Sequence, residues 1–223
     1  MPATPPRTLL LDLDGTLVDS VPDLAASLNR LMASRGQPPF AQDAVALMVG
    51  DGVRVLLERA FAARGGAVES CDVAAFMADY GAHLADATRP FPGAAEAIAT
   101  LRTDGWRIAV CSNKPEALAR GVLEGTGLAA LIDAVGGGDS FPVRKPDPGH
   151  LVATLARAGG AAERAVMVGD HRNDVVAAHG AGMPAVFAAW GYGPPAMAAG
   201  AEAIAASFAE LPAIARRLLP QSL

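Results

Sequence analysis

Short apolar runs alternate with amphipathic segments along most of this chain. Each run is nearly continuous in hydrophobicity, as expected for parallel strands that helices cover on both faces. The alternation predicts an α/β fold built on a doubly wound parallel sheet. The predicted strands are Thr8–Leu13, Arg107–Ser112, Ile132–Val135, Ala165–Gly169 and Ala185–Ala189, and the predicted helices are Gly93–Thr103, Glu116–Glu124, Gly149–Ala158 and Asn173–Gly180.

One long interval interrupts this alternation. Residues 21–88 have helical periodicity without a convincing strand, as in "VPDLAASLNRLMASRG", whose leucines share one face and which ends at Gly36. The interval closes at the prolines of "RPFPG". We therefore predict a Rossmann-like core, residues 1–20 and 89–223, with a helical cap of residues 21–88 inserted after the first strand. The Ala-rich string "AAGAEAIAAS" is expected to form turns and helix.

Composition narrows the classes of function. Of the 223 residues, 52% are hydrophobic, which is enough for a buried core. A formal net charge of -5 and an aromatic content of 5% give no support for nucleic-acid binding. Without a signal-peptide pattern or an apolar span, the predicted location is the cytoplasm, with no membrane partner. The low cysteine content fits a reducing compartment, and Cys111 is expected to be a core residue.

Polar residues follow several predicted strands at their carboxyl ends. In an open parallel sheet these ends meet at one edge, where ligands bind. Each fragment alone is ordinary, since "DG" is a common turn and "KPDP" can begin a helix. Their joint occurrence at successive strand ends predicts an active site. The residues are Asp12, Asp14, Ser112, Asn113, Lys145, Asp170 and Asp174.

The chain resembles the haloacid dehalogenase superfamily over nearly its whole length. Its four motifs are matched by Asp12-Leu13-Asp14-Gly15-Thr16, by Ser112, by Lys145, and by Gly169-Asp170 with Asp174. The helical insertion fits the cap domain of that family. The strings "VGDGVRVLLERAF", "GGDSFPVRKPDPGHL" and "VMVGDHRNDVVAAHGAGMP" are also similar to bacterial phosphoglycolate phosphatases.

The resemblance implies a role for each motif residue. Asp12 is then the nucleophile that forms an aspartyl-phosphate and a metal ligand. Asp14 protonates the leaving oxygen and later activates water, while its backbone carbonyl binds the metal. Lys145 neutralises charge on the nucleophile and the phosphoryl group.

The remaining motif residues are implied to bind phosphate or metal. Thr16, Ser112 and Asn113 would contact the substrate, and Asp170 and Asp174 would hold Mg²⁺. Plainer interpretations stay open for two of them: Asp174 could be a first-turn helix charge, and Asn113 a turn former. Lys114 is expected to be a solvated surface residue.

Charge explains why such a set suits phosphoryl transfer. A phosphate monoester is dianionic near neutral pH, and two like unit charges at 4 Å repel by about 4 kcal/mol at an effective dielectric near 20. A carboxylate nucleophile therefore needs local positive charge. Mg²⁺ in an oxygen-rich site and the Lys145 ammonium can supply it.

The predicted substrate is a small phosphorylated metabolite, 2-phosphoglycolate in the first instance, bound by a monomer or homodimer. Gly52 and Arg54 in "VGDGVR" begin a helix whose backbone N–H groups could receive the substrate carboxylate. An ordinary helix start with a surface arginine explains the same string. Asp51 and His171 depart from related phosphatases, where Asn and Ser or Thr are commoner.

Several other reactions are weighed against this one. Asp14 argues against a dehalogenase, because a halide leaving group needs no proton. The absence of lysine from residues 21–88 argues against the Schiff-base chemistry of phosphonate hydrolases. Alternatives that stay open are a sugar-phosphate phosphatase, for example for N-acetylmuramic acid 6-phosphate, and a β-phosphoglucomutase-like phosphomutase. The non-enzymatic alternative is a sensor of a phosphorylated metabolite.

Overall fold

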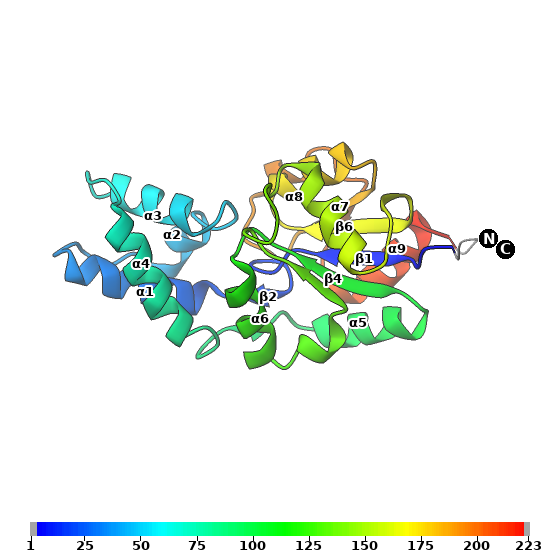
Figure 1. Ribbon diagram of the computed structural model, residues 1–223, viewed down its shortest axis with the longest axis horizontal. Coiled ribbons are helices and arrows are strands. Elements are labelled where there is room, and N and C mark those ends of the chain that lie inside the picture. Colours follow the sequence, from blue (N-terminus) through cyan, green and yellow to red (C-terminus); the bar gives the residue numbers. More distant parts are fainter. Residues whose placement is uncertain (1–3, 221–223) are drawn as a thin grey trace.

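The computed structural model describes residues 4–220 of the chain. Its main sheet has six parallel strands in the order β5-β4-β1-β6-β7-β8. From the central β1 the chain first builds one side of the sheet and then crosses to the other, as a doubly wound fold requires (Figure 1). The strands are β1 (Thr8–Leu11), β4 (Arg107–Cys111), β5 (Ala134–Gly136), β6 (Ala165–Gly169), β7 (Ala185–Ala188) and β8 (Ala203–Ala205).

Helices cover both faces of this sheet, because successive strand residues point to opposite sides. On β1, Leu9 and Leu11 belong to one buried apolar cluster and Leu10 belongs to another. The first cluster includes residues of α5 (Ala94–Thr103), α6 (Glu116–Gly125) and α9 (Leu211–Leu218). The second includes residues of α7 (Pro148–Arg157) and α8 (Arg172–Gly180). The predicted fold class is therefore confirmed.

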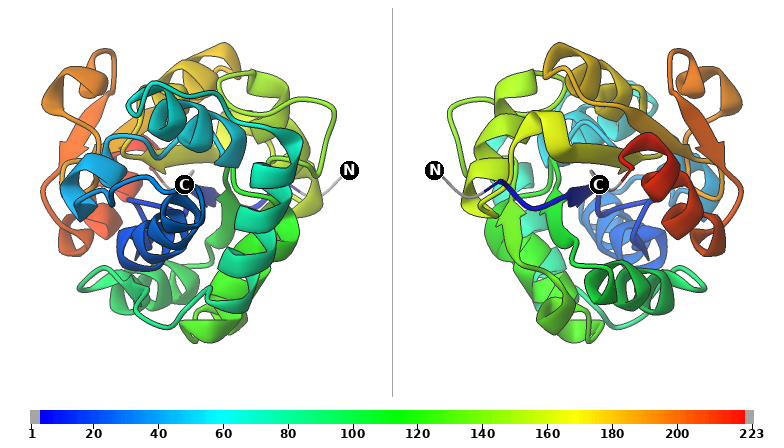
Figure 2. Two further views of the ribbon diagram at one scale, coloured as in Figure 1. Left: turned by 90° about the vertical axis from the view of Figure 1, so that its left-hand side faces the viewer. Right: turned by 90° about the vertical axis from the view of Figure 1, so that its right-hand side faces the viewer.

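Residues 21–88, between β1 and α5, form a separate helical layer beside the carboxyl ends of the strands (Figures 1 and 2). It has its own apolar core, in which Leu28, Phe76 and Tyr80 are fully buried. Two short strands, β2 (Val18–Asp19) and β3 (Arg89–Pro90), pair antiparallel where the chain enters and leaves this layer. Its helices are α1 (Val21–Ser34), α2 (Gln42–Ala46), α3 (Val53–Ala62) and α4 (Ser70–Ala82).

Three details of the sequence prediction are wrong. The strand predicted over Thr8–Leu13 ends at Leu11, because the Leu13 carbonyl already accepts from the N–H groups of a turn at Thr16 and Leu17. Residues 203–205, expected within turns and an Ala-rich helix, form the edge strand β8, which is stabilised by pairing with β7. The strand predicted over Ile132–Val135 begins two residues later, because Ile132 ends the short 3-10 helix Ala129–Leu131. Further 3-10 helices are Ala162–Arg164, Pro195–Ala198 and Phe208–Glu210.

Within residues 4–220, no helix combines the length and the apolar character needed to cross a membrane.

Candidate active site

The active-site residues lie where β1, β4 and β6 end and where the helical layer meets the sheet. Asp12 directly follows β1, Ser112 follows β4 and Asp170 follows β6. A small cavity of about 30 Å³ opens beside them. From the sheet side it is lined by Asp12, Asp14, Ser112, Asn113 and Lys114, and from the helical layer by Leu24, Val49, Gly50, Gly52, Val53, Leu56 and Tyr80.

Lys145 joins two of the carboxylates. Its ammonium lies 3.0 Å from Asp12 Oδ1 and 2.6 Å from Asp174 Oδ1, and all three side chains are buried. Burial alone would lower the pKa of Lys145, but the charges of Asp12 and Asp174 raise it above its ordinary value. Lys145 is therefore a permanent cation beside Asp12.

Asp170 is held in place by three donors. Thr16 Oγ1 donates to Asp170 Oδ1 at 2.8 Å, and the backbone N–H groups of Tyr192 and Gly193 donate to Oδ2 at 2.8 and 3.3 Å. Burial, with Asp12 nearby, raises the pKa of Asp170 to about 6. Gly15 is required here, because its φ is +83° and a Cβ would lie 2.4 Å from Asp170 Oδ2.

Asp12, Asp170 and Asp174 form a buried acidic group. Their closest carboxylate oxygens all lie within 4.8 Å of one another. Burial also raises the pKa of Asp174 above its usual range, with a further contribution from Asp12. Three carboxylates against the single cation Lys145 leave excess negative charge, and an all-oxygen donor set suits Mg²⁺. These residues therefore fit a magnesium ion.

Asp14 has two partners near the cavity. Its Oδ1 accepts a hydrogen bond from Ser20 Oγ at 2.6 Å and lies 2.7 Å from the Lys114 ammonium. The expectation of a solvated Lys114 is wrong, because this residue is only 5% exposed. Its ammonium also donates to the Tyr80 hydroxyl of α4 at 2.7 Å and lies 4.7 Å from the centre of the Tyr80 ring.

The structure brings the other predicted substrate-binding residues only partly together. Gly52 lines the cavity at the start of α3, with φ +90°. The Asn113 side chain lies at the cavity too, but its amide donates to the carbonyls of Gly50 and Lys145, each at 3.0 Å. Arg54 lies outside the set of lining residues, with a side chain 54% exposed and directed to Glu58.

Asp51 belongs to the loop that precedes α3, and His171 packs against Gly50 of the same loop. Asp51 accepts a hydrogen bond from the Asn173 side chain at 2.6 Å and pairs with Arg59. These two contacts lower the pKa of Asp51 despite its partial burial. His171 caps α8 by accepting from the Asn173 N–H. The unusual Asp51 carboxylate is therefore engaged by α3 and α8.

Sequence reasoning missed three residues that organise the site. Tyr80 belongs to an amphipathic helix whose apolar spacing explains an aromatic residue without further function. Tyr192 donates its hydroxyl to Asp19 at 2.8 Å while its N–H holds Asp170. His150 Nδ1 accepts from the Lys145 N–H at 3.2 Å. "KPDPGH" was the available signal for His150, since it follows Lys145 closely.

Cys111 lies behind the site in the sheet, fully buried. Burial raises its pKa to about 12, which keeps the thiol protonated. The expectation of a core residue is confirmed.

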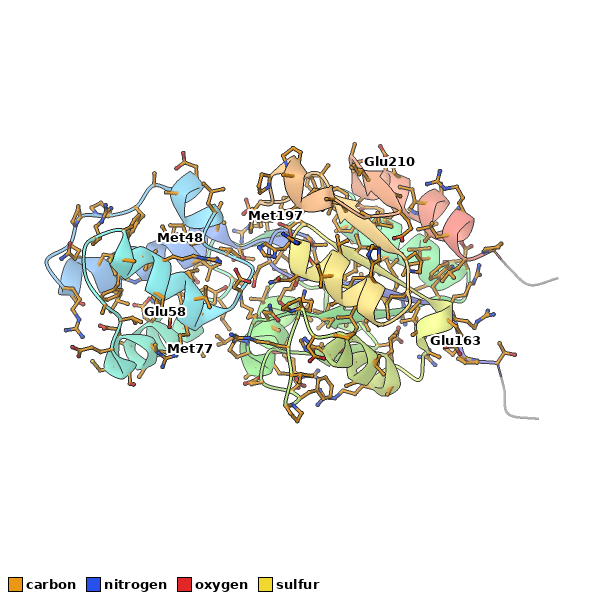
Figure 3. The ribbon with its side chains drawn as sticks, turned by 90° about the horizontal axis from the view of Figure 1, so that it is seen from above. Met48, Glu58, Met77, Glu163, Met197 and Glu210 are labelled. Carbon is orange, nitrogen blue, oxygen red and sulfur yellow. The ribbon has the colours of Figure 1, made fainter. Side chains whose placement is uncertain are left out.

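A second cavity lies on the other side of Gly50 and shares Asp14 with the first. Its polar lining includes Asp170 and His171, and its apolar lining is Ala46, Leu47 and Val49 of the helical layer with Pro194 and Met197 of the sheet side. Met197 lies near the junction of the two layers in Figure 3, with Met48, Glu58 and Met77 across it.

Comparison with known proteins assigns the chain to a family. The model of the haloacid dehalogenase-like hydrolases matches residues 6–182. The chain is a haloacid dehalogenase-like hydrolase. It is 42% identical over 210 residues to the phosphoglycolate phosphatase of Caulobacter vibrioides, covering 92% of this chain and 89% of that one. It is 41% identical over 187 residues to that of Agrobacterium fabrum, covering 82% and 80%.

Solved structures agree with this assignment. A predicted phosphoglycolate phosphatase from Haemophilus somnus superimposes with a TM-score of 0.84 at 30% identity, over 93% of this chain and 97% of that one. CbbY from Rhodobacter sphaeroides in complex with phosphate has a TM-score of 0.79 at 24% identity, over 92% and 96%, and shares the fold. This haloacid dehalogenase-like hydrolase is thus a phosphatase, and the resemblance to phosphoglycolate phosphatases is confirmed.

Proposed function

We propose that this phosphatase hydrolyses 2-phosphoglycolate to glycolate and phosphate through an aspartyl-phosphate on Asp12. The observation that carries the proposal is the position of Asp12 and Asp14 on one small cavity, with Lys145 3.0 Å from Asp12. The relatives named phosphoglycolate phosphatase support the same substrate.

The reaction proceeds in two displacements. An oxygen of Asp12 attacks phosphorus, the bond from phosphorus to the substrate oxygen breaks, and Asp14 gives that oxygen a proton, which releases glycolate. Water then attacks the phosphorus of the aspartyl-phosphate and gives a proton to Asp14. The bond from phosphorus to Asp12 breaks, phosphate leaves, and both carboxyl groups return to their first states.

Lys145 and the hydroxyl groups stabilise the charge that moves in these steps. Lys145 offsets the negative charges of Asp12 and of the phosphoryl group that Asp12 attacks, which at 4 Å repel by about 4 kcal/mol at an effective dielectric near 20. Ser112, at the end of β4, lines the cavity beside Asp12 and can donate to a phosphoryl oxygen. Thr16 acts by fixing Asp170. Asn113 acts by joining the loop at Gly50 to the backbone of Lys145.

Asp12, Asp170, Asp174 and the backbone carbonyl of Asp14 are the proposed magnesium ligands. When bound, Mg²⁺ supplies positive charge to the phosphoryl oxygens. Asp174 also holds Lys145, so its carboxylate orients the cation as well as contributing to the acidic group.

Residues 21–88 are the proposed cap, with residues 1–20 and 89–223 as the core. The cap closes the cavity with the apolar side chains of Leu24, Val49, Val53 and Leu56, which excludes water from the reacting groups. We further propose that the enzyme acts on a small phosphorylated metabolite as a monomer or homodimer.

Replacing the nucleophile tests the proposal. Asp12→Asn should lower kcat for 2-phosphoglycolate by at least about 10³-fold, because an amide cannot form the covalent intermediate. For the wild type and the variant, the rate of phosphate release from 2-phosphoglycolate is measured. It is compared with the rates from hexose phosphates, muramic acid phosphate and pyrophosphate at the same concentration. The thermal unfolding midpoint checks folding. A folded Asp12→Asn variant with near-normal turnover would contradict the nucleophile, and a preference of the wild type for another ester would contradict the substrate.

A further inference from the structure

The chain contains only two lysines, Lys114 and Lys145, and both are buried at the active site. Phosphoryl transfer accounts for Lys145, which balances Asp12 and Asp174. It does not account for Lys114, whose ammonium contacts Asp14 and joins the core to α4 through Tyr80. The position of this second cation requires its own explanation.

Lys114 faces the part of the cavity that a leaving group would occupy. The phosphoryl end is marked by Asp12 and Ser112, and the helical layer supplies an apolar wall of Leu24, Val53 and Leu56. Among the described residues that line this cavity, Lys114 is the only cationic one. An ammonium taken out of water is costly unless it has anionic partners. In this structure that partner is Asp14, 2.7 Å from the ammonium, and an anion entering the cavity would meet in Lys114 the one cationic group of its lining.

Tyr80 adds a directional donor to this cation. Its oxygen accepts a hydrogen bond from Lys114, which leaves its own hydrogen to donate. Tyr80 is fully buried, and burial raises its pKa, so the hydroxyl keeps that hydrogen. The two side chains together offer the two adjacent donors that a carboxylate accepts well.

The connectivity of a substrate with a carboxylate fits these positions. In a phosphorylated 2-hydroxy acid, the carboxylate carbon lies two bonds beyond the leaving oxygen. Asp14 is the residue that contacts the leaving oxygen, and the Lys114 ammonium lies 2.7 Å from Asp14. A carboxylate so close to the leaving oxygen therefore reaches Lys114. It does not reach Arg54, which lies outside the cavity lining with its side chain 54% exposed.

We propose that Lys114 and Tyr80 form a carboxylate subsite that selects phosphorylated 2-hydroxy acids over carboxylate-free phosphate esters. This proposal rests on the proposed function and deepens it. The incoming carboxylate replaces Asp14 as a partner of Lys114, which leaves Asp14 to the leaving oxygen. Because Lys114 comes from the core and Tyr80 from α4, the same contact ties the substrate to both layers.

Ethyl phosphate is the matched probe, since a methyl group stands where 2-phosphoglycolate has its carboxylate. The measured quantity is the ratio of kcat/KM for 2-phosphoglycolate to kcat/KM for ethyl phosphate. Any general damage to Asp14 affects both esters and cancels in this ratio. We expect Lys114→Met to lower the ratio about 100-fold and Tyr80→Phe to lower it about 10-fold, as for lost hydrogen bonds to a buried charge.

Three further variants complete the design. Lys114→Arg keeps the charge and should retain more of the ratio than Lys114→Met. Arg54→Met tests the alternative carboxylate site at the start of α3. Arg217→Met, on the exposed side of α9, is the control for loss of a surface cation and should leave the ratio unchanged.

The outcomes separate the two proposals. An unchanged ratio in Lys114→Met, or a larger loss in Arg54→Met, overturns the subsite while the phosphatase reaction on 2-phosphoglycolate stands. If Lys114→Met does not fold, as judged by thermal unfolding, Tyr80→Phe decides in the same way. If the wild type hydrolyses other esters but not 2-phosphoglycolate, the proposed function itself fails and the subsite falls with it.

Discussion

Lys145 is positioned by its backbone as well as by its ion pairs. Its N–H donates to His150 Nδ1 at 3.2 Å, so the imidazole carries its proton on Nε2, which donates to the Gly137 carbonyl at 3.0 Å. Burial and the nearby Lys145 charge lower the pKa of His150 to about 4. His150 is therefore a neutral positioning residue that fixes where the Lys145 side chain begins.

Removing this anchor should lower turnover. His150→Leu leaves the buried Lys145 N–H without its acceptor, and we expect kcat to fall about 10- to 100-fold with a smaller change in KM. His150→Asn restores an acceptor near the position of Nδ1 and should recover part of kcat. Equal kcat values in the Leu and Asn variants, both folded by circular dichroism, would contradict a positioning role.

Individual residues could be predicted from the sequence only where local position decides their surroundings. Asp12 and Asp170 follow apolar strands, so their meeting at one edge of the sheet follows from the alternation alone. Lys114 follows a strand too, but its burial depends on Tyr80, which lies 34 positions away in the chain. No local pattern indicates that α4 lies over this lysine, and the surface prediction was therefore wrong.

Among the elements, the two connections between the layers are tied by one buried carboxylate. Asp23, in the first turn of α1, accepts hydrogen bonds from the Ala87 and Thr88 N–H groups at 2.8 to 3.0 Å and from Thr88 Oγ1 at 2.7 Å. Asp23 is only 3% exposed. It thereby fixes the outgoing connection against the incoming helix.

Asp23→Ala should destabilise the protein markedly. Two donors of the buried Thr88 lose their acceptor, at about 1 to 3 kcal/mol each before relaxation, and so does the more exposed Ala87 N–H, so we expect the free energy of unfolding in urea to fall by about 3 kcal/mol. The control is Asp86→Ala, a nearby carboxylate whose side chain is 67% exposed, which should change stability little. An equal fall in the free energy of unfolding in the two variants would show that the hydrogen bonds of Asp23 do not stabilise the fold.

The longer elements were predictable because each carries its own periodic pattern. The helices predicted at Gly93, Glu116, Gly149 and Asn173 begin within a residue of those observed. β2 and β3 have two residues each, too few for any period to be visible. β8 is rich in alanine and is a strand only because the edge of β7 pairs with it.

For the molecule as a whole, the acidic group couples stability to pH and metal. The pKa of Asp170 is raised to about 6 and that of Asp174 is also raised, so the folded protein binds protons more tightly here than the unfolded chain. The stabilisation that comes from protonated Asp170 and Asp174 is fully present below about pH 4 and is lost as pH rises through about 6 and above. Mg²⁺ should offset this loss, because it binds the charged carboxylates.

We therefore expect magnesium to stabilise the protein more at pH 8 than at pH 5. At a concentration of about 100 times its dissociation constant, Mg²⁺ should raise Tm by about 5 °C or more at pH 8, against EDTA-treated protein. At pH 5 protons compete for the same oxygens and the rise should be smaller. Asp170→Asn is the control and should abolish most of it. A shift independent of pH would place the metal elsewhere.

The burial of both lysines has a consequence for covalent labelling of the protein. Lys114 and Lys145 are the only lysines of the sequence and both are buried, so reagents that acylate lysine amines find none on the outer surface. A lysine adduct on Lys114 requires that α4 first move away from the core, since Tyr80 covers the ammonium. The extent of acylation at Lys114, read by mass spectrometry, thus reports the fraction of molecules in which α4 has left the core.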